Sequence, residues 1–227
     1  MKDLTVIVPV FNEAISLAQN MAQLKALLKH CSIMFCDGES DDETCFLLKQ
    51  SGLLYCCSLR GRALQMNAGA KLCQSDILLF MHADTVINGS HIQAVKEAMQ
   101  DRAIVGGRFD VHLSGKRKAF RVIEYMINLR SRLTGVSTGD QCQFVRRSVF
   151  EAMGGFSDQP LMEDVAFSKQ LKRYGKVTCL RHKVSTSSRR WEKYGIVKTV
   201  ILMWKLRFLY WLGMSPERLA RMYRNVR

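Results

Sequence analysis

The first ninety residues alternate between short apolar runs and longer segments in which apolar residues recur every three or four positions. The short runs have the length and composition of buried strands, and the longer segments have the spacing of helices. Strands and helices in alternation predict a parallel, doubly wound sheet, and therefore an α/β fold. The predicted strands are residues 4–10, 32–36, 53–59 and 77–81.

The second half of the chain predicts three more strands and further helices. The run at 142–145 alternates apolar and polar residues, which is typical of an antiparallel or edge strand. The other two strands are expected at 103–113 and 176–180, and helices at 91–101, 116–133, 161–174 and 215–224.

Residues 1–191 are predicted to form one domain, and residues 192–227 a basic, amphipathic helical extension. Basic residues interrupt the apolar stretch at 193–212, so it lacks the uncharged span of about twenty residues that a transmembrane helix needs. Two roles stay open for this stretch. It lies on a membrane surface, or it packs on the domain or on a second copy of the chain.

Basic residues are concentrated in the second half. Residues 1–113 contain 10 Lys and Arg against 12 Asp and Glu, whereas residues 114–227 contain 24 against 8. This asymmetry predicts a surface that faces anions, such as a phosphorylated ligand, nucleic acid or acidic lipid. A solvated basic face without a partner is the alternative. The eight cysteines show no metal-ligand spacing, and the chain starts without a signal peptide, so reduced thiols and a cytoplasmic location are expected.

Acidic residues recur where the predicted strands end. Glu13 follows the first strand, Asp37 ends the second and Asp84 follows the fourth, two residues after His82. The pair at 163–164 begins a helix. Because the carboxyl ends of parallel strands meet at one edge of a sheet, these side chains predict a ligand site there. A turn role for Asp84 is the alternative.

The glycine patterns exclude two nucleotide-binding classes. The chain has no Gly-x-Gly-x-x-Gly after its first strand and no Gly-rich loop that ends in Gly-Lys-Ser/Thr. A dinucleotide-binding fold and a P-loop NTPase are therefore disfavoured. Arg60 and Arg62 lie after the third strand, where they would offset the charge of a ligand's phosphates.

Seven segments follow one another along the chain: VIVPVFNE, DGESDD, GRALQMNAGA, LLFMHADT, TGDQ, MEDVAFSKQL and SSRRW. In this order they resemble the family 2 glycosyltransferases of the GT-A fold. The chain is most similar to a short bacterial subgroup with an LHADT-type metal motif and a C-terminal LGxSPERLxxxY, often labelled arsenosugar-biosynthesis or carotenoid-acid glycosyltransferases. The resemblance implies inverting transfer of a sugar from a nucleoside-diphosphate sugar to an acceptor hydroxyl of a small molecule or lipid.

The resemblance also implies which residues bind the donor. Pro9, Glu13 and Asp37 would hold the base and ribose of the nucleotide, and Arg60 and Arg62 would lie near it. At the other end of the domain, the compressed SSRRW motif would place two arginines near the pyrophosphate or the acceptor. These arginines are Arg189 and Arg190.

The family's Asp-x-Asp metal motif falls on residues 82–84. Asp84 matches the carboxylate that binds Mn²⁺ or Mg²⁺ at the diphosphate, whereas His82 replaces the first aspartate. An imidazole favours Mn²⁺, because Mg²⁺ prefers oxygen ligands. Asp164 matches the general base that takes the proton of the acceptor hydroxyl, and Glu163 would tune or orient it.

Two other functions are weighed against this one. A sugar nucleotidyltransferase would share the nucleotide-binding half, but the Gly-rich start with a following Arg is missing. A binding module without catalysis would dock its basic half on a membrane or on nucleic acid, and no nucleic-acid motif is present to support specific binding. Peripheral membrane contact and a homo-oligomer are expectations that accompany the transferase.

Overall fold

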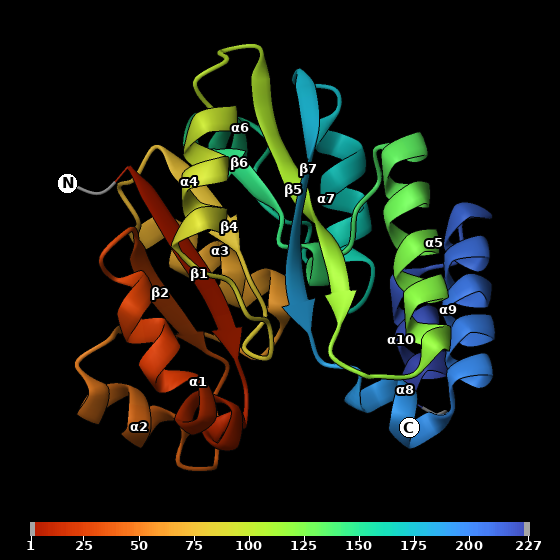
Figure 1. The fold of residues 1–227 in the computed structure, drawn as a ribbon, viewed down its shortest axis with the longest axis horizontal. Helices are drawn as coiled ribbons and strands as arrows, with labels where there is room; N and C mark the ends of the chain where they lie inside the picture. Colours follow the sequence, from red (N-terminus) through yellow and green to blue (C-terminus); the bar gives the residue numbers. More distant parts are fainter. Residues whose placement is uncertain (1–2, 225–227) are drawn as a thin grey trace.

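The computed structural model describes residues 3–224, without the side chains of Arg190 and Arg224. Seven strands form one sheet in the order β3-β2-β1-β4-β6-β5-β7 (Figure 1). The strands are β1 (Leu4–Val10), β2 (Ser32–Asp37), β3 (Leu54–Cys57), β4 (Ile77–Phe80), β5 (Ile104–Leu113), β6 (Phe144–Arg146) and β7 (Lys176–Thr186).

The sheet is mostly parallel, as predicted. Strands β1, β2, β3 and β4 pair in parallel, as do β5 and β7. Strand β6 is antiparallel to both β4 and β5. The prediction of an antiparallel strand near 142–145 is therefore confirmed, and this strand lies inside the sheet and not at its edge. A mixed sheet with helices on both faces agrees with the predicted GT-A fold.

Strand β7 is longer than the sequence pattern predicted. It continues past 176–180 to Thr186 and pairs with the whole length of β5, with a register shift after Phe109. The added segment begins with the exposed Arg181, His182 and Lys183. Polar side chains are tolerated there because β7 lies at the edge of the sheet, so hydrophobic periodicity does not reveal the strand.

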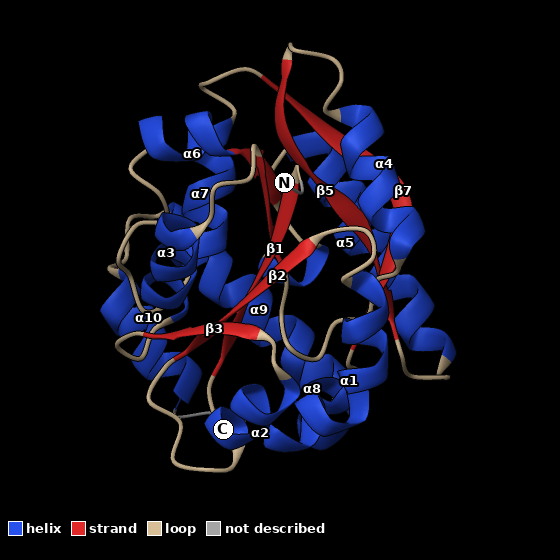
Figure 2. Cartoon of the chain, turned by 90° about the vertical axis from the view of Figure 1, so that its left-hand side faces the viewer, coloured by secondary structure: helices blue, strands red, loops and turns tan. Residues whose placement is uncertain are grey.

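Helices cover both faces of the sheet (Figure 2). Alternate residues of β1, such as Val6 and Val8, pack with α1, α2 and α4, whereas Ile7 faces the cluster that includes α3, α6 and α7. The helices that cover the sheet are α1 (Ala14–Leu27), α2 (Thr44–Ser51), α3 (Arg62–Leu72), α4 (Gly89–Ala98), α6 (Arg147–Ala152) and α7 (Glu163–Leu171). Helix α5 (Lys118–Thr134) runs beside β5 and leads into a short 3₁₀ helix, η1 (Gly139–Gln141).

The C-terminal extension packs on α7. It contains α8 (Arg189–Tyr194), α9 (Ile196–Trp211) and α10 (Pro216–Arg224). Leu206 and Leu219 form a separate apolar cluster with Met162 and Val165 at the start of α7. One side of the extension is thus part of the domain's packing. Among the described residues, no helix is long and apolar enough to cross a membrane.

Candidate active site

The loops after β1 and β2 are tied together at the carboxyl edge of the sheet. The buried Gln65 amide donates hydrogen bonds to the carbonyl oxygens of Val10 (2.6 Å), the last residue of β1, and Cys36 (2.8 Å), the next-to-last residue of β2. The backbone N–H of Asn12 donates to the Ser40 hydroxyl (2.9 Å). These bonds fix the two loops relative to each other, so the residues predicted to hold the nucleotide share one rim.

Asp37 is the most enclosed of these residues. Its side chain is almost fully buried, and one carboxylate oxygen accepts the backbone N–H of Ser40 (3.0 Å). Burial, and then Asp37 itself, raise the pKa of the neighbouring Cys45 thiol to about 12. The ligand atoms of Asp37, Cys45 and Cys57 lie within 4.8 Å of one another. Sequence spacing gave no sign of this cluster, because strand pairing brings Cys57 beside Asp37.

Three other residues predicted at the nucleotide lie in or near the end of β1. Pro9 lies in β1, paired with Cys36 in β2. Glu13 precedes α1, and its carboxylate accepts the hydroxyl of Ser16 (2.6 Å). The Arg60 guanidinium lies 3.9 Å from the centre of the Phe11 ring, at the same end of β1. This contact orders an exposed arginine at the rim.

The predicted metal ligands follow β4 and lie against η1. His82 and Asp84 are both half-buried. A Cβ atom on Gly139 would collide with the imidazole of His82, so η1 passes directly over this ring. Burial raises the pKa of Cys142, and the carboxylates of Asp140 and Asp84 raise it further, which places both near the end of η1.

The predicted base is held by the same short helix. One oxygen of Asp164 accepts the backbone N–H of Gly139 (2.7 Å), and the other accepts the N–H of Val165 (2.7 Å). Burial raises the pKa of Asp164, and Asp140 raises it further, although the hydrogen bond from Gly139 opposes this change. A raised pKa suits a carboxylate that must accept a proton near neutral pH.

Glu163 lies between the predicted base, Asp164, and Arg62, which is predicted to lie near the nucleotide. It is 5% exposed, and burial followed by the charge of Asp164 raise its pKa to about 7. Arg62, at the start of α3, opposes this rise from 4.0 Å away. Arg62 and the acidic pair at the start of α7 are far apart in the sequence, and the fold brings them together.

Within residues 3–224, four residues other than glycine adopt left-handed backbone conformations, and they flank this rim. They cost of order 1–3 kcal/mol each and persist only where the surrounding structure holds them. They lie in the loops after β1 and β2, after η1 and before α7. These loops carry the charged residues described above. They are Asn12 (φ 54°), Glu39 (φ 63°), Cys142 (φ 47°) and Met162 (φ 67°).

Three charged residues at this site were missed by the sequence analysis. Asp140 belongs to the TGDQ segment but was given no role, and its Oδ1 is buried without a hydrogen-bond partner. Arg130 on α5 and Arg207 on α9 both interact electrostatically with Asp140 and Asp164. The TGDQ motif was a signal for Asp140, whereas nothing in the spacing distinguished these arginines from others on the same helices.

The predicted arginines of the SSRRW segment lie at the start of α8. Arg189 is exposed, and its backbone N–H donates to the Ser187 hydroxyl (3.2 Å). The side chain of Arg190 lies outside the described residues. The roles of both arginines stay predictions.

A divalent ion fits the donor set of His82 and Asp84. One imidazole and one carboxylate are too few to enclose a cation, but Mg²⁺ and Mn²⁺ sites in phosphate-transferring enzymes are completed by substrate oxygens and water. The neighbouring Asp140, with its unpartnered buried oxygen, adds negative charge nearby. The residues present therefore suit an ion that binds together with a diphosphate.

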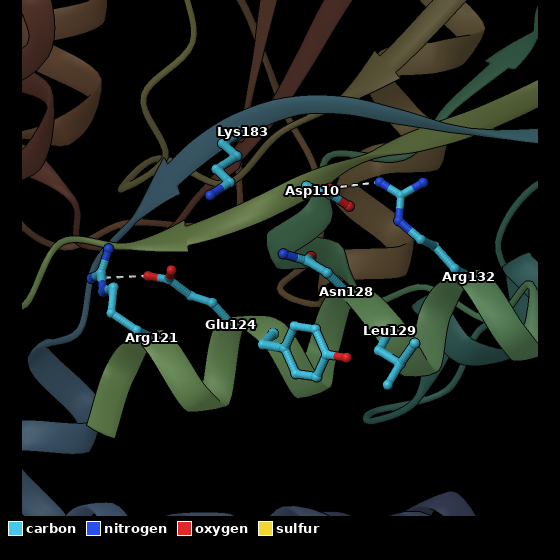
Figure 3. A pocket seen from close by; sticks show the side chains of 8 residues that line it. Asp110, Arg121, Glu124, Asn128, Leu129, Arg132 and Lys183 are labelled. Carbon is cyan, nitrogen blue, oxygen red and sulfur yellow. Dashed lines mark hydrogen bonds and ion pairs between the residues drawn. The ribbon is translucent and has the colours of Figure 1, made fainter. Parts of the chain in front are cut away.

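A second depression lies between α5 and strands β5 and β7 (Figure 3). Four of the five charged side chains that line it, all but that of Lys183, form ion pairs within residues 3–224. Asp110 binds Arg108 and accepts from Arg132 (2.6 Å), and Glu124 accepts from Arg121 (2.9 Å). This pairing leaves few groups to bind a ligand.

The fold is that of the GT-A glycosyltransferases, and solved structures share it. They include a Pyrobaculum calidifontis mannosyltransferase with GDP-Man and Mn²⁺ (17% identity, TM-score 0.62) and S. aureus TarS with UDP-GlcNAc (17%, 0.67). A third is Mycobacterium tuberculosis glucosyl-3-phosphoglycerate synthase with Mn²⁺, UDP and glucosyl-3-phosphoglycerate (11%, 0.61). The matches cover 81%, 82% and 80% of this chain, which spans 56%, 58% and 70% of theirs.

The family model for glycosyl transferase family 2 matches residues 5–154, more than half of the chain. The chain therefore belongs to this family. No curated protein matches the sequence. The predicted family and fold are confirmed, and the predicted subgroup stays a prediction.

Proposed function

We propose that the protein is a metal-dependent, inverting glycosyltransferase that moves a sugar from a nucleoside diphosphate to an acceptor hydroxyl. One observation carries the proposal. The backbone of Gly139 holds the Asp164 carboxylate through a 2.7 Å hydrogen bond while it lies against the imidazole of His82. The proposed base and the proposed metal ligand thus meet at one loop.

Asp164 is the proton acceptor in this proposal. As the acceptor hydroxyl attacks the anomeric carbon, its proton passes to a carboxylate oxygen of Asp164. Attack comes from the face opposite the leaving diphosphate, so the anomeric configuration inverts. Glu163, beside it, holds its own proton up to about neutral pH and limits the negative charge around the base.

The donor binds along the rim formed by β1, β2 and β4. Pro9, Glu13 and Asp37 contact the nucleoside, and Arg60 and Arg62 offset the charge of the phosphates. His82 and Asp84 hold the divalent ion, which when bound stabilises the leaving diphosphate. The solved structures that contain GDP-Man with Mn²⁺, or UDP-GlcNAc, support a donor of this class.

A thermal-shift screen of nucleotide-sugars with Mn²⁺ tests the donor. The donor should raise the melting temperature in proportion to its affinity, because it binds only the folded state. Asp84→Ala should weaken binding of the selected UDP or GDP nucleotide in calorimetry by about tenfold or more, because the ion loses its carboxylate ligand. Unchanged affinity would remove Asp84 from the metal site.

We also propose that α9 contacts an anionic membrane surface. Five apolar residues spaced three or four apart form an exposed stripe on the side of α9 away from α7: Val197, Ile201, Trp204, Phe208 and Trp211. The helix carries exposed lysines and no acidic residue. Two tryptophans beside lysines suit a lipid headgroup region, whereas two copies of a basic face repel each other.

Vesicle co-sedimentation tests this contact. The protein should bind vesicles that contain phosphatidylglycerol and not pure phosphatidylcholine. Trp204→Ser with Phe208→Ser should abolish binding, whereas Phe46→Ser, which removes an equally exposed aromatic on α2, should not. Equal binding by all three proteins would contradict the proposal, as would a stable dimer that the stripe variant disrupts.

A further inference from the structure

We propose that Arg130 and Arg207 bind an anionic group of the acceptor, a phosphate or a carboxylate, beside Asp164. The inference deepens the proposed function and rests on it, because Asp164 faces the acceptor only if it is the base. The site is built from two helices that are far apart in the sequence. Arg130 comes from α5 and Arg207 from α9 (Figure 1).

The two arginines are within electrostatic range of each other and of Asp164. Arg207 and Arg130 interact electrostatically, and both interact with Asp140 and Asp164. Arg207 follows Leu206, which is fully buried in the cluster that joins α9 to α7. Arg207 itself is half-buried and interacts with Asp140 and Asp164, so its side chain faces the site and not bulk solvent.

The guanidinium of Arg130 is incompletely satisfied. Its Nε and Nη2 atoms are buried and have no hydrogen-bond partner in the described structure. Within residues 3–224, no side-chain carboxylate lies within ion-pair distance of Arg130 or Arg207. A buried donor without an acceptor is costly, and a second arginine nearby adds repulsion. The arrangement is unfavourable for the fold alone.

An oxyanion would satisfy both arginines. Phosphate and carboxylate accept paired hydrogen bonds from the planar guanidinium group, and these charge-assisted bonds are among the strongest in proteins. An acceptor with a hydroxyl and an acidic group would then present the hydroxyl to Asp164 and the anion to the arginines. The proposed function already assigns the diphosphate of the donor to the ion at His82 and Asp84 and to Arg60 and Arg62, so it leaves Arg130 and Arg207 for the acceptor.

Arg130→Met and Arg207→Met test the site, with Lys118→Met and Lys205→Met as matched controls. Each control removes an exposed lysine from the same helix, α5 or α9. Inorganic phosphate, added to metal-free protein at constant ionic strength, should raise the melting temperature of the wild type and both controls. The response should require about tenfold more phosphate in either arginine variant, since a charge-assisted hydrogen bond contributes at least that factor.

A second arm distinguishes the acceptor from the donor. UDP or GDP affinity with Mn²⁺, measured by calorimetry, should change less than about twofold in the arginine variants, a free-energy difference well below 1 kcal/mol. A tenfold loss would show that the arginines hold the donor's diphosphate and would overturn the proposal. A phosphate response that is absent in the wild type, or equal in all five proteins, would overturn it as well.

The melting temperatures of the ligand-free variants show whether the two arginines serve ligand binding or the stability of the fold. Both methionine variants should melt at the wild-type temperature or above it, because an apolar side chain replaces a buried charge without a contact partner. A clear fall in both would show that the arginines serve the fold and would contradict the proposal. If the wild type binds no nucleotide, the transferase and the acceptor assignment fail together, whereas a phosphate response lost in the variants would still establish the anion site.

Discussion

Helix α5 separates two groups of buried charges that differ in their contacts. On one side, around Asp110 and Glu124, carboxylates and guanidinium groups are paired at hydrogen-bond distance (Figure 3). On the other side, Arg130 and Asp140 keep buried polar atoms without a hydrogen-bond partner in the described structure. Both groups are costly to desolvate, but the first recovers most of that cost through its ion pairs, although the Nε atom of Arg108 is also buried without a hydrogen-bond partner in the described structure.

The difference indicates what each group is for. Asp110 bridges Arg108 of its own strand and Arg132 of α5, so it fastens the helix to the sheet. Glu124 does the same farther along, where it accepts the backbone N–H of Leu113 (2.6 Å). The charged residues around Asp164 contribute much less to holding helices and strands together. They lie where the proposed reaction needs a base and cations. Substitutions around Asp164 should therefore lower activity more than stability, and substitutions around Asp110 should lower stability more than activity.

Asp164→Asn should give the largest effect. Loss of the proton acceptor should lower transfer or donor hydrolysis by about 10²–10⁴-fold, the usual contribution of a general base. Nucleotide affinity should be kept, whereas the melting temperature should fall slightly, because the asparagine amide offers one acceptor oxygen to the two backbone N–H groups that Asp164 now accepts. Turnover assays and calorimetry on one preparation check this, and full activity would remove Asp164 as the base.

Asp110→Asn should lower the stability of the fold and leave nucleotide binding by the folded protein unchanged. It leaves the buried Arg108 without its carboxylate partner, and the loss of one partner of a buried pair costs about 3–5 kcal/mol. Urea denaturation should show this loss, while the remaining folded protein binds nucleotide normally. Arg147→Met, which breaks an exposed pair with Glu151 on α6, should cost no more than about 0.5 kcal/mol. Equal losses in the two variants would contradict the distinction drawn for α5.

Glu163→Gln should change the pH dependence of stability. The folded-state pKa of Glu163 is raised to about 7, so the folded state binds a proton that the unfolded state has released. This contribution is complete below the unfolded pKa and is lost as pH rises through about 7. The wild type should therefore lose stability relative to Glu163→Gln between about pH 5 and pH 8, by about 3 kcal/mol at most. Parallel denaturation profiles would contradict the raised pKa.

The sequence predicted the parts of the site that local pattern encodes. Apolar runs located the strands of the parallel core, and the acidic residues at their ends pointed to one rim. Arg130 and Arg207 were not predictable in this way, because their position depends on how α5 and α9 pack and on which helix face turns inward. Strand β7 was predicted too short for a similar reason, since an edge strand needs no apolar pattern along its polar segment.

The anomeric configuration of the released sugar tests the central claim most directly. The wild type, with Mn²⁺ and the donor selected by thermal shift, should hydrolyse it slowly, with water in place of the acceptor. Proton NMR at early times should show a β-sugar from an α-linked donor, and Asp164→Asn should release almost none. An α-sugar from that donor, or equal release by the variant, would contradict inverting transfer with Asp164 as the base.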